Sequence, residues 1–110
     1  MIQMKPIVFL GDALRRVREF PEDARRTVGH ELRDLQFGEE PSDWKPMPSV
    51  GAGVREIRVR EASGAFRVIY VAHLETAIYV LNAFQKKTQK TPQREIDLAR
   101  RRLHAITEEP

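Results

Sequence analysis

Residues 77–92, AIYVLNAFQKKTQKTP, join the most apolar run of the chain to a strongly basic helix. The run Ala77–Phe84 is apolar on both faces, which is typical of a strand inside a sheet. Three lysines follow within five residues, Lys86, Lys87 and Lys90, with no acidic residue among them. A loop that only had to be soluble would usually mix the signs of its charges, so this link indicates a polyanionic partner.

A β-rich half precedes this link. Residues 54–60, VREIRVR, alternate apolar and charged side chains, and residues 66–73 form a second strand pattern. Turn-forming residues occupy positions 62–64 and 74–76. Short turns of this kind connect neighbouring antiparallel strands, so together with the run 77–84 we expect a three-stranded meander.

The N-terminal half predicts one strand and a helical hairpin. Residues 7–10 form a short apolar strand, and Asp12 can cap a helix over residues 13–19. Pro21 suits the first position of a second helix, which Gly38 would end. The arginines of this hairpin have acidic neighbours in the sequence, so we expect them to stabilise or solvate the helices.

The last predicted element is a basic helix. Thr91 would cap this helix, and Pro92 would be its first residue. Its buried stripe comprises Ile96, Ala99, Leu103 and Ile106. Its remaining surface carries Arg94, Arg100, Arg101 and Arg102. The order β-α-α-β-β-β-α predicts a single α+β domain over residues 1–110, in which an antiparallel meander sheet packs against the helical hairpin and the C-terminal helix.

Residues 39–53 form the longest segment without a regular pattern, and they contain three prolines. Trp44 is the only tryptophan of the chain. Because its ring can bury a large area, we expect it to anchor this segment to the body of the domain. A platform for base stacking is the alternative.

Composition excludes several classes of protein. The chain of 110 residues has no cysteine, which excludes disulfides and thiolate metal sites. None of the three histidines has a second ligand at metal spacing, so we expect neither a metal nor another cofactor. No apolar run approaches the ~20 residues of a membrane helix. We therefore expect a soluble, cytoplasmic protein without a membrane partner.

Positive charge is concentrated in the second half of the chain. Residues 1–53 carry 8 basic and 9 acidic side chains, whereas residues 54–104 carry 11 basic and 5 acidic ones. The net charge is only +3, but the second half would still present a positive field. Such a field favours nucleic acid or another acidic partner, and a merely solvated basic face is the alternative.

Cationic side chains should meet on one face of the meander. Arg58 and Arg60 share a strand face, and Arg67 lies on the neighbouring strand. Lys86 and Lys87 follow where the third strand ends. Paired strands stand about 5 Å apart, and like charges at that distance are costly without a shared anion, which predicts a phosphate site. The alternative is that acids of the same strand neutralise these arginines as weak surface bridges, namely Glu56 and Glu61.

Three segments together resemble a known family. VREIRVR at 54–60, GAFRVIY at 64–70 and FQKKTQKTP at 84–92, followed by a basic helix, are similar to the RelE/ParE toxin superfamily and, within it, to the phage-derived HigB-like branch. The resemblance extends over residues 7–104. It implies a toxin of a type II toxin–antitoxin system that acts as a ribosome-dependent mRNA endonuclease. It also implies two partners, a cognate helix-turn-helix antitoxin of the HigA-like kind and mRNA on the ribosome.

The resemblance implies roles for individual residues. Arg58 matches a basic residue near the scissile phosphate, and Arg67 matches the arginine after the glycine–aromatic turn. Glu56 stands where the family has a lysine, and the family's C-terminal catalytic tyrosine has no counterpart. HigB-like toxins rely partly on histidines, and His73 is the one expected near the site. The expected catalytic residues are Arg58, Arg67, Lys87 and His73, and the expected RNA-binding residues are Arg60, Lys86, Lys90 and Arg94.

The implied reaction is attack of a ribose 2′-OH on the adjacent phosphate, with the cations stabilising the phosphorane. The proton acceptor stays open among His73, Tyr70, a lysine with a lowered pKa and a ribosomal group. Two other functions also stay open. One is inhibition of DNA gyrase, as in ParE-like members of the superfamily. The other is a non-catalytic regulatory protein that binds nucleic acid.

Overall fold

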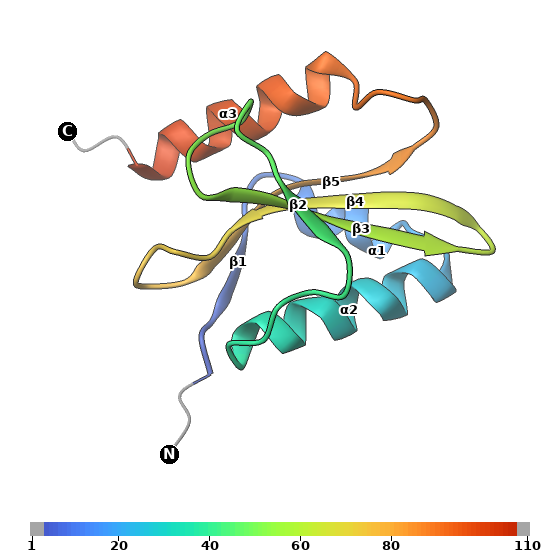
Figure 1. The fold of residues 1–110 in the computed structure, drawn as a ribbon, viewed down its shortest axis with the longest axis horizontal. Coiled ribbons are helices and arrows are strands. Elements are labelled where there is room, and N and C mark those ends of the chain that lie inside the picture. Colours follow the sequence, from blue (N-terminus) through green and yellow to red (C-terminus); the bar gives the residue numbers. More distant parts are fainter. Residues whose placement is uncertain (1–3, 108–110) are drawn as a thin grey trace.

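The computed structural model describes residues 4–107, which form five strands and three helices (Figure 1). In chain order these are β1 (Ile7–Phe9), α1 (Ala13–Arg18), α2 (Glu22–Gln36), β2 (Trp44–Pro46), β3 (Val54–Glu61), β4 (Gly64–Val71), β5 (Ile78–Lys86) and α3 (Gln93–Thr107). The predicted α+β class is confirmed. In the described part of the chain, no helix is long and apolar enough to cross a membrane.

The strands form one mixed sheet in the order β1-β5-β4-β3-β2. The predicted meander is confirmed, because β3, β4 and β5 pair antiparallel as consecutive neighbours. Strand β5 lies inside the sheet as expected, although β4 occupies the middle. The sheet is not wholly antiparallel, because β1 pairs with β5 in parallel register.

Strand β2 is the element that sequence reasoning missed. The segment 39–53, expected to be irregular, contributes three residues to the sheet edge, where Trp44 pairs with Ile57 and Lys45 with Glu56. Pro46 ends the strand. A proline is tolerated at an edge because its missing N–H is not needed there, so the local sequence carries no strong strand signal.

Helices cover both faces of the sheet (Figure 1). On one face α1 packs over β5 and α2 packs over β3 and β4, and the buried cluster between them includes Val28, Phe66 and Tyr70. On the other face Leu103 of α3 packs over Ile69 and neighbouring apolar residues. The domain therefore has two apolar layers, and a polar residue on the sheet has a definite face. The face under α3 is called the α3 face below.

Helix α1 begins at Ala13 as predicted, whereas α2 and α3 each begin one residue later than predicted. Helix α2 begins at Glu22, with Pro21 as its N-cap. The backbone oxygen of Pro92 accepts the Ile96 N–H at 3.3 Å, so Pro92 occupies the cap position expected for Thr91. The Thr91 hydroxyl instead lies 3.5 Å from a carboxylate oxygen of Glu56. Gly38 ends α2 as predicted, with a φ of 85° that favours glycine.

A polar network joins α1, β5 and α3. Asp12 precedes α1, but its side chain makes no cap hydrogen bond. Its carboxylate instead accepts hydrogen bonds from Arg16 at 3.0 Å and from Arg102 at 2.5 Å. Arg16 also donates to Glu95 at 2.9 Å, and Arg102 to the backbone oxygen of Leu81. Arg102, expected on the solvent-exposed surface of α3, therefore points inward, because Asp12 and the Leu81 carbonyl supply its partners.

Candidate nucleic-acid interface

Strand register brings the predicted cations together. Arg58 on β3 stands directly opposite Arg67 on β4. One step along the sheet, Arg60 pairs with Ala65, which in turn pairs with Lys86 on β5. Because side chains alternate along a strand, all of these cations project to the α3 face. Lys45, the partner of Glu56 across β2 and β3, projects to the same face. The cationic face is defined here as Lys45, Arg58, Arg60, Arg67 and Lys86.

Arg67 is buried beneath this face. Its side chain is 5% exposed and forms an ion pair with Glu56, whose side chain is 2% exposed. The Nε of Arg67 lies 3.6 Å from Oε1 of Glu56, which is too long for a hydrogen bond. One terminal nitrogen donates to the Phe66 carbonyl at 3.0 Å. Burial lowers the pKa of Arg67, the Glu56 charge opposes that shift, and the charge of Arg58 adds to it.

The members of the cationic face other than Arg67 have no acidic partner in the described part of the chain. Within residues 4–107, Arg58, Arg60 and Lys86 lie in no ion pair within 4.0 Å. Glu61 accepts a hydrogen bond from Thr27 of α2 instead. The alternative of surface bridges is therefore wrong for Arg58 and Arg60. Glu56 neutralises Arg67, but Arg58, Arg60 and Lys86, unpaired among residues 4–107, leave the surface with a net positive charge. A phosphate can neutralise this charge.

Besides Arg67, Lys86 is a member of the cationic face whose pKa is lowered. Its partial burial lowers the pKa, and the charge of Arg67 lowers it further. Glu56 acts in the opposite direction, whereas Lys45 and Arg58 add to the lowering. Sequence reasoning did not select Lys45. Its position on the face depends on β2, which has no recognisable sequence signal.

The predicted catalytic residue Lys87 and the predicted RNA-binding residues Lys90 and Arg94 are not part of the cationic face. Lys87 and Lys90 are exposed in the link after β5, and Arg94 is exposed in the first turn of α3. The Thr88 hydroxyl donates to the Lys90 carbonyl at 2.6 Å and shapes the link. These side chains can contribute positive field, but among the described residues they contact none of the buried members.

His73 lies elsewhere. It follows β4 at the end where Val71 pairs with Val54, and its ring packs against Gly53. Arg67 lies six residues before His73 in the sequence, or roughly 20 Å at the rise of a strand. The expectation that His73 lies close to the site is wrong, because the meander carries the β4–β5 connection away from the cationic face.

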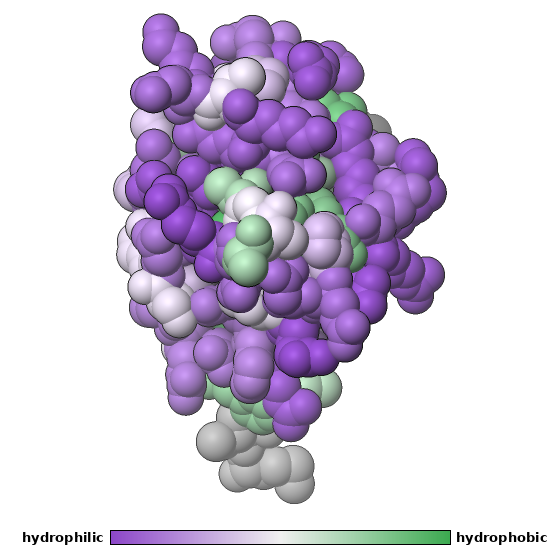
Figure 2. Space-filling view, turned by 90° about the vertical axis from the view of Figure 1, so that its right-hand side faces the viewer, coloured by the Kyte–Doolittle hydropathy of each residue, from purple (hydrophilic) through white to green (hydrophobic). Residues whose placement is uncertain are grey.

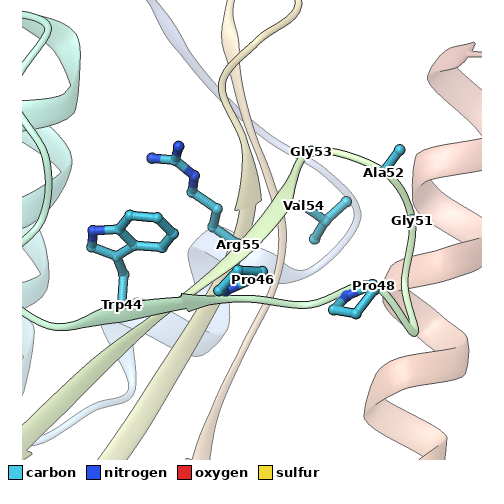
Figure 3. Close-up of a pocket in the computed structure, with 8 residues that line it drawn as sticks. All are labelled: Trp44, Pro46, Pro48, Gly51, Ala52, Gly53, Val54 and Arg55. Atoms are coloured by element: carbon cyan, nitrogen blue, oxygen red, sulfur yellow. The ribbon is translucent and has the colours of Figure 1, made fainter.

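The described cavities do not coincide with the cationic face. The cavity in Figure 3 has a volume of about 260 Å³ and is formed by β2, the start of β3 and the loop between them. Two further cavities share its Arg55 and extend toward His73 and Lys5. The Arg55 guanidinium lies 3.9 Å from the ring centroid of Trp44 and pairs with Glu40 at 2.6 Å. This stacking favours an anchoring role for Trp44 over a base platform, since Arg55 already covers the ring.

The end of the molecule with the β3–β4 turn and the β5–α3 link is mainly hydrophilic. Figure 2 views this end and shows polar residues around a small central area of apolar character. On the cationic face, Lys45 and Arg60 are exposed, and Arg58 and Lys86 are half-buried. A partly exposed cationic surface suits a large polyanion better than a small buried ligand.

Comparison with known proteins agrees with this geometry. The family model of the phage-derived Gp49-like proteins matches residues 15–104, most of the chain. The chain belongs to this family. No curated protein matches it. The Gp49-like proteins are a RelE-like toxin family in general, so membership is consistent with the toxin of a toxin–antitoxin pair. The matched range includes β2, β3, β4, β5 and most of α3, and hence the whole cationic face of this Gp49-like chain.

Proposed function

We propose that this chain is the HigB-like toxin of a type II toxin–antitoxin system and a ribosome-dependent mRNA endonuclease. One observation supports the proposal above the others. Arg58 stands opposite the buried Arg67, with Lys86 beside them, and the exposed cations have no acidic partner among residues 4–107. A face of this kind gains stability when a phosphate binds, and gains more when that phosphate carries extra charge.

The chemistry that suits the face is attack of a ribose 2′-OH on the adjacent phosphate. The new O–P bond gives a phosphorane, and the P–O5′ bond then breaks. The products are a 2′,3′-cyclic phosphate and a 5′-alkoxide, which takes a proton from water to become the 5′-OH. Donors fixed in place stabilise the developing charge without reorganisation. Arg58 would contact the phosphorane from the surface and Arg67 from below. Lys87, at the end of β5, would strengthen the field.

A proton must leave the attacking 2′-OH. Two of the acceptors named above suit the proposal less well, because His73 lies away from the face and Tyr70 is buried in the apolar cluster on the other side of the sheet. Lys86 has a lowered pKa and belongs to the cationic face. Its neutral amine is therefore the acceptor that we propose within this chain.

The partners follow from the same proposal. The substrate would be mRNA held in the ribosome, and a helix-turn-helix antitoxin of the HigA-like kind would neutralise the toxin. The face offers such an antitoxin a target for acidic side chains, since Arg58 and Arg60 lack protein partners in the described chain.

Induction in growing cells tests the proposal. We expect wild-type protein to arrest growth, with protein synthesis falling before DNA supercoiling changes. Arg58→Ala should relieve the arrest, whereas Arg101→Ala, which removes the same charge from an exposed site on α3, should not. Supercoiling that fails first would indicate a gyrase inhibitor. Arrest by Arg58→Ala at the wild-type level would contradict the role of the cationic face.

A further inference from the structure

A buried acid lies within the cationic face, and the proposed reaction does not use it. Glu56 is 1% exposed and projects to the same face as Arg58, Arg60 and Lys86. Its negative charge opposes phosphate binding nearby. Burial of a carboxylate is also costly unless it is paired. An interaction of Glu56 is therefore expected to offset these two costs.

The contacts of Arg67 indicate what that interaction is. Its guanidinium has rigid, planar donors, so fixing two nitrogens fixes the direction of the third. One terminal nitrogen donates to the Phe66 carbonyl, and Nε faces Glu56 at 3.6 Å. Nε is fully buried and makes no hydrogen bond. The other terminal nitrogen, Nη2, makes no hydrogen bond to residues 4–107 and is not among the fully buried unpaired atoms.

Thr91 brings a second element to the same carboxylate. Its hydroxyl lies 3.5 Å from Oε2 of Glu56, while Oε1 faces Arg67. The two oxygens of Glu56 thus face β4 on one side and the end of the lysine-rich link on the other. The link carries Lys87 and Lys90, so its distance from the face depends on this contact.

We propose that Glu56 is a positioning residue, which holds the Arg67 guanidinium with Nη2 turned to the phosphate bound beside Arg58 and fixes the start of α3 through Thr91. The proposal rests on the proposed nuclease function for its kinetic consequence. Its structural part, that Glu56 orders Arg67, stands independently of any cleavage.

Binding and cleavage should respond in opposite directions to Glu56→Gln. Removal of a negative charge from a cationic face leaves RNA binding unchanged or stronger. The cleavage rate should fall at least about tenfold. One fixed donor contributes a factor of about 10²–10³ to the rate, and a misaligned donor loses part of that factor. Glu56→Asp retains the charge and should recover part of the lost rate. A purely structural defect would weaken binding and cleavage together.

The experiment uses the full-length protein with ribosomes programmed by a labelled mRNA. The wild-type cut site is mapped first, and binding is measured with an mRNA that carries a 2′-deoxy nucleotide at that site. Single-turnover cleavage is then compared for wild type, Glu56→Gln, Glu56→Asp and the control Glu61→Gln. Circular dichroism confirms that each variant is folded. Equal cleavage by Glu56→Gln and wild type would overturn the proposal, as would a parallel loss of binding.

Nuclear magnetic resonance of the arginine Nε–H groups tests the structural role of Glu56 without a cleavage assay. In the wild type, the Arg67 Nε–H should exchange slowly with solvent, and Arg67→Lys identifies its signal. Glu56→Gln should speed that exchange at least about tenfold, while Glu61→Gln should leave it unchanged. If the wild type does not cleave mRNA, the proposed function fails and this signal still decides the role of Glu56. Unchanged exchange in folded Glu56→Gln would refute the positioning role.

Discussion

At the scale of single residues, the cationic face combines one buried pair with several unpaired charges. Glu56 neutralises Arg67 and is itself close to further cations, since Lys45 is its partner on β2 and Arg58 lies two residues along β3 on the same face. The two members of the pair are therefore not equivalent. Loss of Arg67 leaves Glu56 with other cations, whereas loss of Glu56 leaves a buried guanidinium among like charges.

This asymmetry predicts unequal stability losses. Glu56→Gln should lower the free energy of unfolding by about 3 kcal/mol, the lower end of the cost of breaking a buried pair. Arg67→Gln should cost clearly less. Urea unfolding at pH 7 measures both. Sodium phosphate should restore part of the Glu56→Gln loss relative to sodium chloride of equal ionic strength, because a bound anion replaces the missing charge. A larger loss for Arg67→Gln would contradict this account of the face.

Lys86 predicts a pH dependence of cleavage. Burial and the neighbouring Arg67 hold its pKa below the ordinary 10.5, so the neutral amine forms at a lower pH than in a free lysine. If that amine accepts the proton, the cleavage rate rises with pH and levels off before pH 10.5. Lys86→Arg keeps the charge but cannot release a proton, so the rising limb should disappear. An unchanged pH profile in this variant would exclude Lys86 as the acceptor.

At the scale of elements, the position of the face depends on how α3 is held. Asp12 before α1 binds Arg102 of α3, and Arg16 of α1 binds Glu95 at the start of α3. Hydrogen bonding from Arg102, opposed by burial and supported by Arg16, lowers the pKa of Asp12 to about 2. Its folded pKa thus lies below the ordinary 3.8. The stabilisation is complete above about pH 4 and is lost as the pH falls toward 2.

Asp12→Asn tests this connection. The variant should lose about 1–3 kcal/mol at pH 7, as expected when hydrogen bonds to a charged group are weakened. The difference from wild type should shrink below pH 4 and vanish below pH 2, where wild-type Asp12 is itself mostly protonated. Asp97→Asn, an acid on α3 whose ion pair with Arg100 is long at 4.0 Å, serves as the control. A difference that persists undiminished below pH 2 would show that Asp12 acts through something other than its charge.

The elements also show what a sequence can and cannot predict. A tight turn between β3 and β4 sets the register, so the pairing of Arg58 with Arg67 was predictable from the alternation of the strands. Strand β2 and hence Lys45 were not, because three edge residues ending in proline depend on tertiary partners. The inward direction of Arg102 likewise depends on Asp12, 90 residues away in the sequence. His73 was expected at the site because of its residue type. In the structure it follows the C-terminal end of β4, away from the cationic face.

At the scale of the whole molecule, the helices cover both faces of the sheet and leave the cationic face partly exposed at one end. Helices α1 and α2 cover one face of the sheet, and α3 covers the other (Figure 1). The cationic face lies near the start of α3, where the lysine-rich link leaves β5, so its exposed cations have access to a large partner. This arrangement suits a substrate held in the ribosome. It also suits an acidic antitoxin segment that competes for the same surface.

Single-turnover cleavage of mRNA on programmed ribosomes tests the central claim most directly. Purified wild-type protein should cut the mRNA and leave a 2′,3′-cyclic phosphate, Arg58→Ala should be about 10²–10³-fold slower, and Arg101→Ala should match the wild type. Intact mRNA with the wild-type protein, or equal rates for wild type and Arg58→Ala, would contradict the assignment of the cationic face as the active site of a nuclease.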